Sequence, residues 1–229
     1  MIRHKLSFAL RLIDDFTGKI VGKTSCIFQM DGRLISTIYK EEGLYLFMEP
    51  MECPCVLRIE AKDYFPGEVL INQRELDPAY PVVDVRLYHK PGGKFPYRCS
   101  LCCGKITPPK PGMPFMVYGI SSVDSGYMLK SVKDIESMTV LELAGYHKEK
   151  LPGRVFGLGE GKDLEVFVIT EKSGVNDYLI SERLCKVHNK GDKLFRVYRT
   201  YADGEGNYVL PVAEGTEDQI NVVTKVVDT

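Results

Sequence analysis

The sequence predicts an all-β chain of two tandem sandwich modules, the second of which carries an insertion. Three observations lead to this fold class. Residues 42–66 hold two short alternating apolar runs, separated by a proline-bearing turn and closed by an aromatic pair, which is the pattern of a hairpin in a small β-sandwich. Residues 203–211 repeat a glycine turn before an aromatic strand that stops at proline. Residues 89–94 combine proline, glycine and charge, and therefore predict a linker between the modules.

The first module is predicted to span residues 1–90. Its opening strand alternates, with the leucines and the phenylalanine of residues 6–12 on one face. Asp31-Gly32 is a strong hairpin signal, because both residues tolerate a positive φ. Turn signals between about seven short strands are typical of an immunoglobulin-like or transthyretin-like sandwich. The predicted strands are residues 6–12, 24–30, 34–39, 43–47, 55–61, 68–72 and 82–87.

The second module is predicted to span residues 95–229 and to be sandwich-like. The prolines of residues 108–114 exclude regular structure there and predict an exposed loop. Residues 131–137 are predicted as a short helix. Charged turns are dense between Gly145 and Gly191, so we expect the insertion in that stretch. Residues rich in β-branched and aromatic side chains predict strands at 97–106, 115–120, 139–143, 154–158, 164–170, 178–180, 194–201, 208–212 and 220–227.

Charge and cysteine content limit the partners and the compartment. Thirty basic against thirty-one acidic residues give a net charge of -1, so the chain has no positive excess for nucleic acid or for an acidic membrane surface. No apolar run reaches the roughly 18 residues that a membrane helix needs. The seven cysteines are odd in number and irregularly spaced, which argues against a disulfide framework. The apolar stretch at residues 6–10 is too short for a signal peptide. We therefore expect reduced thiols and a cytoplasmic location.

Three segments of the first module carry a resemblance to a known family. Residues 11–18 (RLIDDFTG), 43–47 (GLYLF) and 63–66 (DYFP) resemble the carboxypeptidase regulatory-like family of small transthyretin-like sandwiches. Members with such an opening resemble proteins associated with phage-tail-like contractile injection particles. The resemblance therefore implies an accessory module without catalytic residues, working in a particle assembled in the cytoplasm. The chain departs from the family at residues 51–55 (MECPC), where relatives tend to carry a Pro-Gly turn.

Cysteine spacing offers a metal site as an alternative. Cys53, Cys55, Cys99 and Cys102 would present thiolates to a tetrahedral zinc ion if the two modules folded against each other. However, C-x-C is a poor half-site, and a strand through Cys99 and Cys102 places them on opposite faces. Free cysteine also behaves as a small buried apolar side chain. The sequence therefore predicts no metal and no cofactor.

The remaining motifs favour structural roles over catalysis. Residues 157–162 resemble a phosphate loop, but a strand and not a helix is predicted to follow them, so we expect a hairpin loop. Cys26 and Cys185 are predicted to be core residues. No serine lies in a nucleophile elbow. The histidines have no partner at ligand spacing and are expected in solvated loops; they are His4, His89, His147 and His188.

The sequence therefore predicts a non-enzymatic structural or adaptor protein that acts through sheet edges and loops in a larger assembly. It would associate with itself or with other particle components. The terminal strand, which includes Val222, Val223 and Val226, is β-branched and almost uncharged, so its edge is expected to pair with a strand. The alternative is a module that binds a small ligand or a carbohydrate through aromatic loop residues. Those residues are Tyr64, Phe65, Tyr80 and Phe95.

Overall fold

The chain is all-β in the computed structural model, which describes residues 6–48, 54–95, 98–110, 112–135, 138–145, 150–159 and 163–224. The predicted all-β class is confirmed. The chain divides into two compact units. Unit 1 comprises Met1–Asp15 and Lys19–Phe95, and unit 2 comprises Phe16–Gly18 and Pro96–Thr229. No helix within the described ranges is long and apolar enough to cross a membrane.

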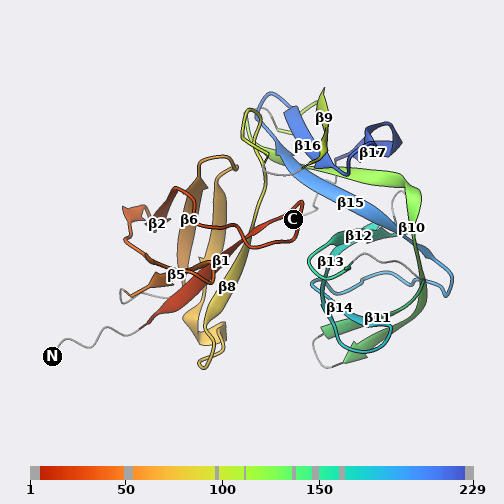
Figure 1. Cartoon of the computed structure of the whole chain (residues 1–229), viewed down its shortest axis with the longest axis horizontal. Coiled ribbons are helices and arrows are strands. Elements are labelled where there is room, and N and C mark those ends of the chain that lie inside the picture. The colour runs from red at the N-terminus through yellow and green to blue at the C-terminus, as the bar shows by residue number, and fades with distance from the viewer. Residues whose placement is uncertain are drawn as a thin grey trace. The chain divides into compact units, whose positions relative to one another are not determined.

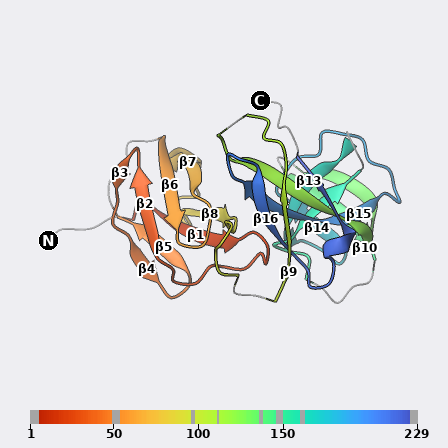
Figure 2. The ribbon, with the colours of Figure 1, turned by 90° about the horizontal axis from the view of Figure 1, so that it is seen from above.

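Unit 1 contains two four-stranded sheets, whose strands are labelled in Figures 1 and 2. In the first sheet, β1 pairs antiparallel with β5 and parallel with β8. The second sheet is antiparallel throughout and has the order β3-β2-β6-β7. The strands of the first sheet, in spatial order, are β4 (Ile38–Lys40), β5 (Leu44–Phe47), β1 (Phe8–Asp14) and β8 (Val82–Leu87). Those of the second are β3 (Arg33–Leu34), β2 (Cys26–Met30), β6 (Cys55–Ala61) and β7 (Gly67–Ile71), followed by the 3-10 turn η1 (Gln73–Glu75).

Aromatic side chains from both sheets form the core of unit 1. Phe8 of β1 stacks on Phe47 of β5 with ring centroids 4.3 Å apart. Phe28 of β2 lies 5.0 Å from Tyr45 and 5.4 Å from Phe47, so the second sheet packs directly on the first. The inner face predicted for the opening strand is confirmed at Phe8, Leu10 and Leu12, which are buried, although Ser7 and Ala9 on the other face are buried as well. Burying each such side chain stabilises the fold by roughly 1.5 to 3 kcal/mol.

Unit 2 is built on a closed barrel of six strands. Its order is β10-β11-β14-β13-β12-β15, and β15 pairs back onto β10 to close it. The sheet continues beyond the barrel through β16 to β9 on one side and through β17 on the other. The strands are β9 (Ser100–Lys105), β10 (Phe115–Ile135), β11 (Met138–Ala144), β12 (Val155–Leu158), β13 (Glu165–Lys172), β14 (Asp177–Ile180), β15 (Lys193–Ala202), β16 (Asn207–Val212) and β17 (Ile220–Val223), with the 3-10 turn η3 (Glu217–Gln219) before β17.

Strand β10 links the barrel to the rest of the sheet. Its first part pairs with β15 and β17, and its last part pairs with β11. The register against β15 shifts between Ile120 and Asp124 and again between Asp124 and Met128. Such bulges bend a strand and increase its twist. Figure 1 shows β10, in green, bending as it passes from β15 to β11.

The barrel encloses its own apolar core. Side chains from its strands and from the β11–β12 connection fill it, and Leu141, Leu158, Phe167, Ile169 and Leu194 are among those with no measurable exposure. β12 is buried on both faces. Phe156 and Leu158 belong to the barrel core, whereas Val155 packs on the opposite face against Val168 and Val197.

The structure corrects two sequence predictions for this half of the chain. Ser131–Ile135, predicted to begin a short helix, continue strand β10. Residues between Gly145 and Gly191 were expected to form an insertion in a sandwich. They contain β12, β13 and β14, which are three of the strands that form the barrel. The tandem arrangement of two immunoglobulin-like sandwiches is therefore not confirmed.

Candidate functional site

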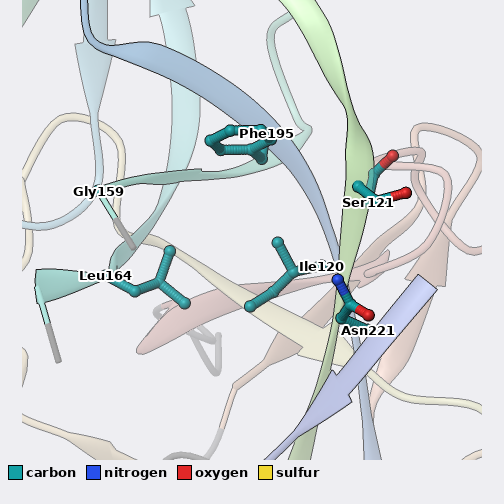
Figure 3. Close-up of a pocket in the computed structure, with 7 residues that line it drawn as sticks. Ile120, Ser121, Gly159, Leu164, Phe195 and Asn221 are labelled. Atoms are coloured by element: carbon teal, nitrogen blue, oxygen red, sulfur yellow. The ribbon is translucent and has the colours of Figure 1, made fainter. Parts of the chain in front are cut away.

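A pocket of about 360 Å³ opens on unit 2 where strand β10 bends. Figure 3 shows the side chains of Ile120, Leu164 and Phe195 around one shared space, with Asn221 beside Ile120. The apolar side chains come from β10, from the residue before β13 and from β15, whereas Asn221 comes from β17. The lining residues described are Ile120, Ser121, Ser122, Gly159, Leu164, Phe195 and Asn221.

Strand register and one glycine explain this convergence. Ile120 lies opposite Val197 of β15 and Asn221 of β17, and opposed residues of an antiparallel pair share a face of the sheet. On β12, Gly157 leaves this face without a side chain. A Cβ at Gly157 would lie 2.9 Å from Cδ1 of Leu164 and 3.1 Å from Cγ2 of Val197. The glycine therefore makes room for the two side chains beside the pocket.

A second pocket of about 310 Å³ adjoins the first. It shares Gly159 and Phe195 with the first pocket and is also lined by Gly191, Asp192 and Lys193. Its lining therefore includes both signs of charge. The Lys193 ammonium is already engaged, because Nζ lies 2.9 Å from Oδ2 of Asp124.

His188 and Glu165 form an enclosed pair next to these pockets. Nε2 of His188 lies 2.7 Å from Oε2 of Glu165, and the two side chains are only 3% and 13% exposed. Nδ1 of His188 lies 3.8 Å from Oδ2 of Asp192. The backbone amides of Cys185 and Lys186 donate to the two oxygens of Glu165 at 2.7 and 3.0 Å. This carboxylate thus ties the loop after β14 to the start of β13.

The pKa of Glu165 reflects this environment. Burial acts to raise it, but the hydrogen bonds from the Cys185 amide, from His188 and from the Lys186 amide outweigh burial and hold the pKa below its ordinary value. Glu165 is therefore ionised at neutral pH. Because the imidazole of His188 is enclosed, the arrangement is suited to fixing the loop and not to proton transfer with a bound substrate. The prediction that His188 is a solvated loop residue is wrong.

Unit 1 contains a second buried polar cluster, centred on Asp14. Nε2 of His89 lies 2.7 Å from Oδ2 of Asp14, and the Tyr64 hydroxyl donates to the same oxygen at 3.2 Å. The ring of His89 lies between those of Tyr64 and Phe95, with centroid distances of 4.4 and 4.6 Å. His89 is 2% exposed, so its prediction as a solvated histidine is also wrong. His4 and His147 lie outside the described residues.

The predicted aromatic binding residues do not form one surface. Tyr64 is buried, Phe65 and Phe95 are half-buried, and Tyr80 is 59% exposed. Tyr80 lies before β8. Tyr64 and Phe95 both contact the ring of His89, which lies after β8. At about 3.3 Å per residue, a six-residue strand separates them by roughly 20 Å. The structure therefore brings Tyr64 and Phe95 together and leaves Tyr80 apart.

The cysteines proposed as zinc ligands occupy different environments. Cys55 is buried in the core of unit 1, and Cys99 and Cys102 are half-buried in unit 2. Burial raises the pKa of the Cys102 thiol, whose Sγ lies 3.7 Å from the carbonyl oxygen of Glu217. Cys53 lies outside the described residues, and no group of three or more His, Cys, Asp or Glu residues in the described ranges could hold a metal ion. Cys26 packs against the core of unit 1 as predicted, but Cys185 is exposed, so its prediction as a core residue is wrong.

The predicted terminal strand is present as β17, in which Val222 is half-buried and Val223 is 37% exposed. Val226 lies outside the described residues. The predicted hairpin around residues 157–162 is confirmed by the antiparallel pairing of β12 and β13.

Comparisons of this chain with models of protein families, with curated proteins and with solved structures find no match.

Sequence reasoning missed the pocket because its lining residues have no shared motif. Ile120, Leu164 and Phe195 are ordinary strand or turn-flanking residues when read locally. Register across β10, β15 and β17 brings them together, and that register is not visible in a single segment. The closely spaced glycines at 157 and 159 are the one local signal, and by themselves they indicate a hairpin loop and not a pocket wall.

Proposed function

We propose that the protein is a non-catalytic adaptor that joins a larger assembly through the open edge of strand β17. The observation that supports this most is the composition and place of the strand. β17 ends the order of the large sheet, and within the described ranges no strand pairs with its outer side. An edge of this kind offers unpaired amide and carbonyl groups to another strand.

The edge of β17 lacks the usual protection against pairing. Ile220–Val223 contain no charge and no proline, and they pair with Tyr118–Ser121 of β10 without a register shift. Monomeric proteins normally block such edges with charge, proline or a bulge. The opposite edge differs, because β9 ends at Lys105 and the backbone of the β16–β17 connection contacts it through Ser100 and Cys102.

The enclosed histidines support a non-catalytic role. Each lies 2.7 Å from a buried or largely buried carboxylate, His89 from Asp14 and His188 from Glu165. The imidazole rings of His89 and His188 therefore each contact a carboxylate inside the protein. The resemblance of residues 11–18 to modules of phage-tail-like particles suggests the setting, a contractile particle assembled in the cytoplasm, in which the added strand comes from a second copy or from another particle component.

Substituting lysine at Val223 tests the proposal, because it adds charge to the edge at a side chain that is already 37% exposed. In sedimentation velocity over a concentration series, we expect wild-type protein to self-associate and Val223→Lys to remain monomeric, with little change in the thermal transition. Val175→Lys is the matched control, since Val175 is 84% exposed and lies in the β13–β14 turn. A wild-type protein that stays monomeric and captures no particle component would count against the adaptor role.

A further inference from the structure

We infer that the pocket at the bend of β10 binds a small uncharged ring that carries a hydroxyl or amide group at one edge. This inference goes beyond the adaptor proposal, because it uses the Asn221 side chain of β17 in the pocket and not the outer backbone edge of that strand. The volume of about 360 Å³ falls near the lower end of the range for ligand sites, roughly 300 to 1,000 Å³.

The apolar side of the pocket suits the face of a ring. Ile120, Leu164 and Phe195 project into the same space from separate parts of the chain (Figure 3). Their positions are fixed by the β10–β15 pairing and by the β12–β13 hairpin, so the walls are present before a ligand arrives. A ring placed against Phe195 would gain both buried apolar area and an aromatic contact.

The polar side of the pocket offers neutral hydrogen-bonding groups. The side chains of Ser122 and Asn221 make no hydrogen bond within the described part of the chain. Ser121 is more constrained, because its hydroxyl donates to the carbonyl of Val123 at 3.1 Å and accepts from the Val123 amide at 3.2 Å. The hydroxyl of Ser122 and the carboxamide of Asn221 can each donate and accept, which matches a hydroxyl or an amide on the ligand.

The charge of the lining selects against an ionised ligand. None of the described residues that line the pocket is charged. The nearest ammonium in the adjoining pocket, that of Lys193, is held 2.9 Å from Asp124. A carboxylate or an ammonium in this pocket would therefore lose its hydration without gaining an ionic partner among the described lining residues, because Asp192 and Lys193 line the adjoining pocket.

The test uses three probes on the full chain, titrated by ligand-observed NMR. Benzamide has the proposed chemistry, benzoate has the same shape with a negative charge, and glucose is an uncharged ring without an aromatic face. We expect benzamide to bind, and benzoate and glucose to bind at least about tenfold more weakly. Binding of benzoate or glucose as tight as that of benzamide would overturn the ligand class, and no binding of benzamide would overturn the site.

Two substitutions locate the binding. Phe195→Ala should weaken benzamide binding by roughly tenfold or more, because it removes one wall. Ser122→Phe should abolish binding by filling the pocket from an exposed position, with the thermal transition retained as evidence of folding. Ser173→Phe, in the exposed β13–β14 turn, is the matched control and should bind like wild type. Unchanged binding by a folded Ser122→Phe protein would show that benzamide binds elsewhere and would overturn the inference.

Discussion

At the scale of single residues, buried carboxylates hold the loops of both units. Glu165 is the case whose pH dependence follows directly from its contacts. Its pKa in the folded chain lies below the ordinary value of 4.5, so its stabilising effect is fully present above that value and is lost as pH falls through the folded pKa. Unit 2 should therefore lose stability in acid as Glu165 becomes protonated.

Glu165→Gln should lower the free energy of unfolding at pH 7 by roughly 1 to 3 kcal/mol, because the hydrogen bonds to a carboxylate become bonds to a neutral amide. The difference from wild type should shrink as the pH falls below 4.5. Urea unfolding at several pH values measures both effects. Glu171→Gln, at an exposed position of the same strand, is the control and should match wild type within about 0.5 kcal/mol. An equal loss at pH 3 and pH 7 would contradict this account.

Tyr64 and Tyr80 provide a second matched pair in unit 1. Tyr64→Phe removes the hydroxyl that donates to buried Asp14 and should cost roughly 1 to 3 kcal/mol of unfolding free energy. Tyr80→Phe changes a side chain that is 59% exposed and should have an effect of less than about 0.5 kcal/mol. Chemical denaturation of the two variants makes the comparison. If both variants were as stable as wild type, the hydrogen bond from the Tyr64 hydroxyl to Asp14 would not stabilise unit 1.

At the scale of elements, two glycines separate backbone strain from steric contact, Gly206 in the β15–β16 turn and Gly215 in the connection between β16 and η3. Gly206 has a φ of +88°, and a Cβ there would overlap the carbonyl oxygen of Ile106. Gly215 has a φ of +74° but no atom within 4 Å of a Cβ. Gly215→Ala should therefore cost only the left-handed conformation, about 1 to 2 kcal/mol, whereas Gly206→Ala should cost clearly more. Thermal unfolding of the two variants checks this order, and equal costs would show that the turn relaxes freely.

The sequence predicted elements well where one face of a strand is buried. The inner face predicted for residues 6–12 is confirmed by the burial of Phe8 and Leu10, and Asp31-Gly32 does turn the chain between β2 and β3. It failed at Ser131–Ile135, because that part of β10 is largely exposed on both faces and shows no period of two. A strand without a buried face carries no pattern that distinguishes it from a polar helix.

Barrel closure and the pocket could not be predicted for a different reason. Both depend on pairing between β10 and β15, which are far apart in the sequence, and on bulges near Ile120 and Asp124. No local signal specifies which distant strand closes a sheet, and the one glycine at the bulges, Gly126, indicates a local bend but not the strand that pairs across it. Strand β17, by contrast, could be predicted from composition, because Ile220–Val223 are four consecutive uncharged residues without proline.

At the scale of the whole molecule, the first unit is expected to fold without the second. A fragment that ends at Phe95 should be more stable than one that ends at Lys90, by about 0.5 to 1.5 kcal/mol, because the ring of Phe95 packs against that of His89 with centroids 4.6 Å apart. The amide of Lys94 also donates to Asp63, so the predicted linker residues contribute contacts inside unit 1. Circular dichroism and denaturant titration of the two fragments measure this. Two unfolded fragments would contradict the independence of unit 1.

Deleting residues 219–229 should both destabilise unit 2 and abolish assembly, because the deletion removes β17 and uncovers the edge of β10. The thermal transition and the sedimentation profile of the truncated chain report the two effects. A truncated chain that kept its stability and its oligomeric state would show that β17 has neither role.

Amide hydrogen exchange of β17 tests the adaptor account most directly. The measurement compares Ile220–Val223 in dilute protein and in the assembled state, whether the assembly is formed by the protein alone or with particle components. If a strand is added at this edge, amides that face outward become paired, and exchange in β17 should slow markedly on assembly while that of the exposed β13–β14 turn stays the same. An assembly in which exchange of β17 is unchanged would contradict the account.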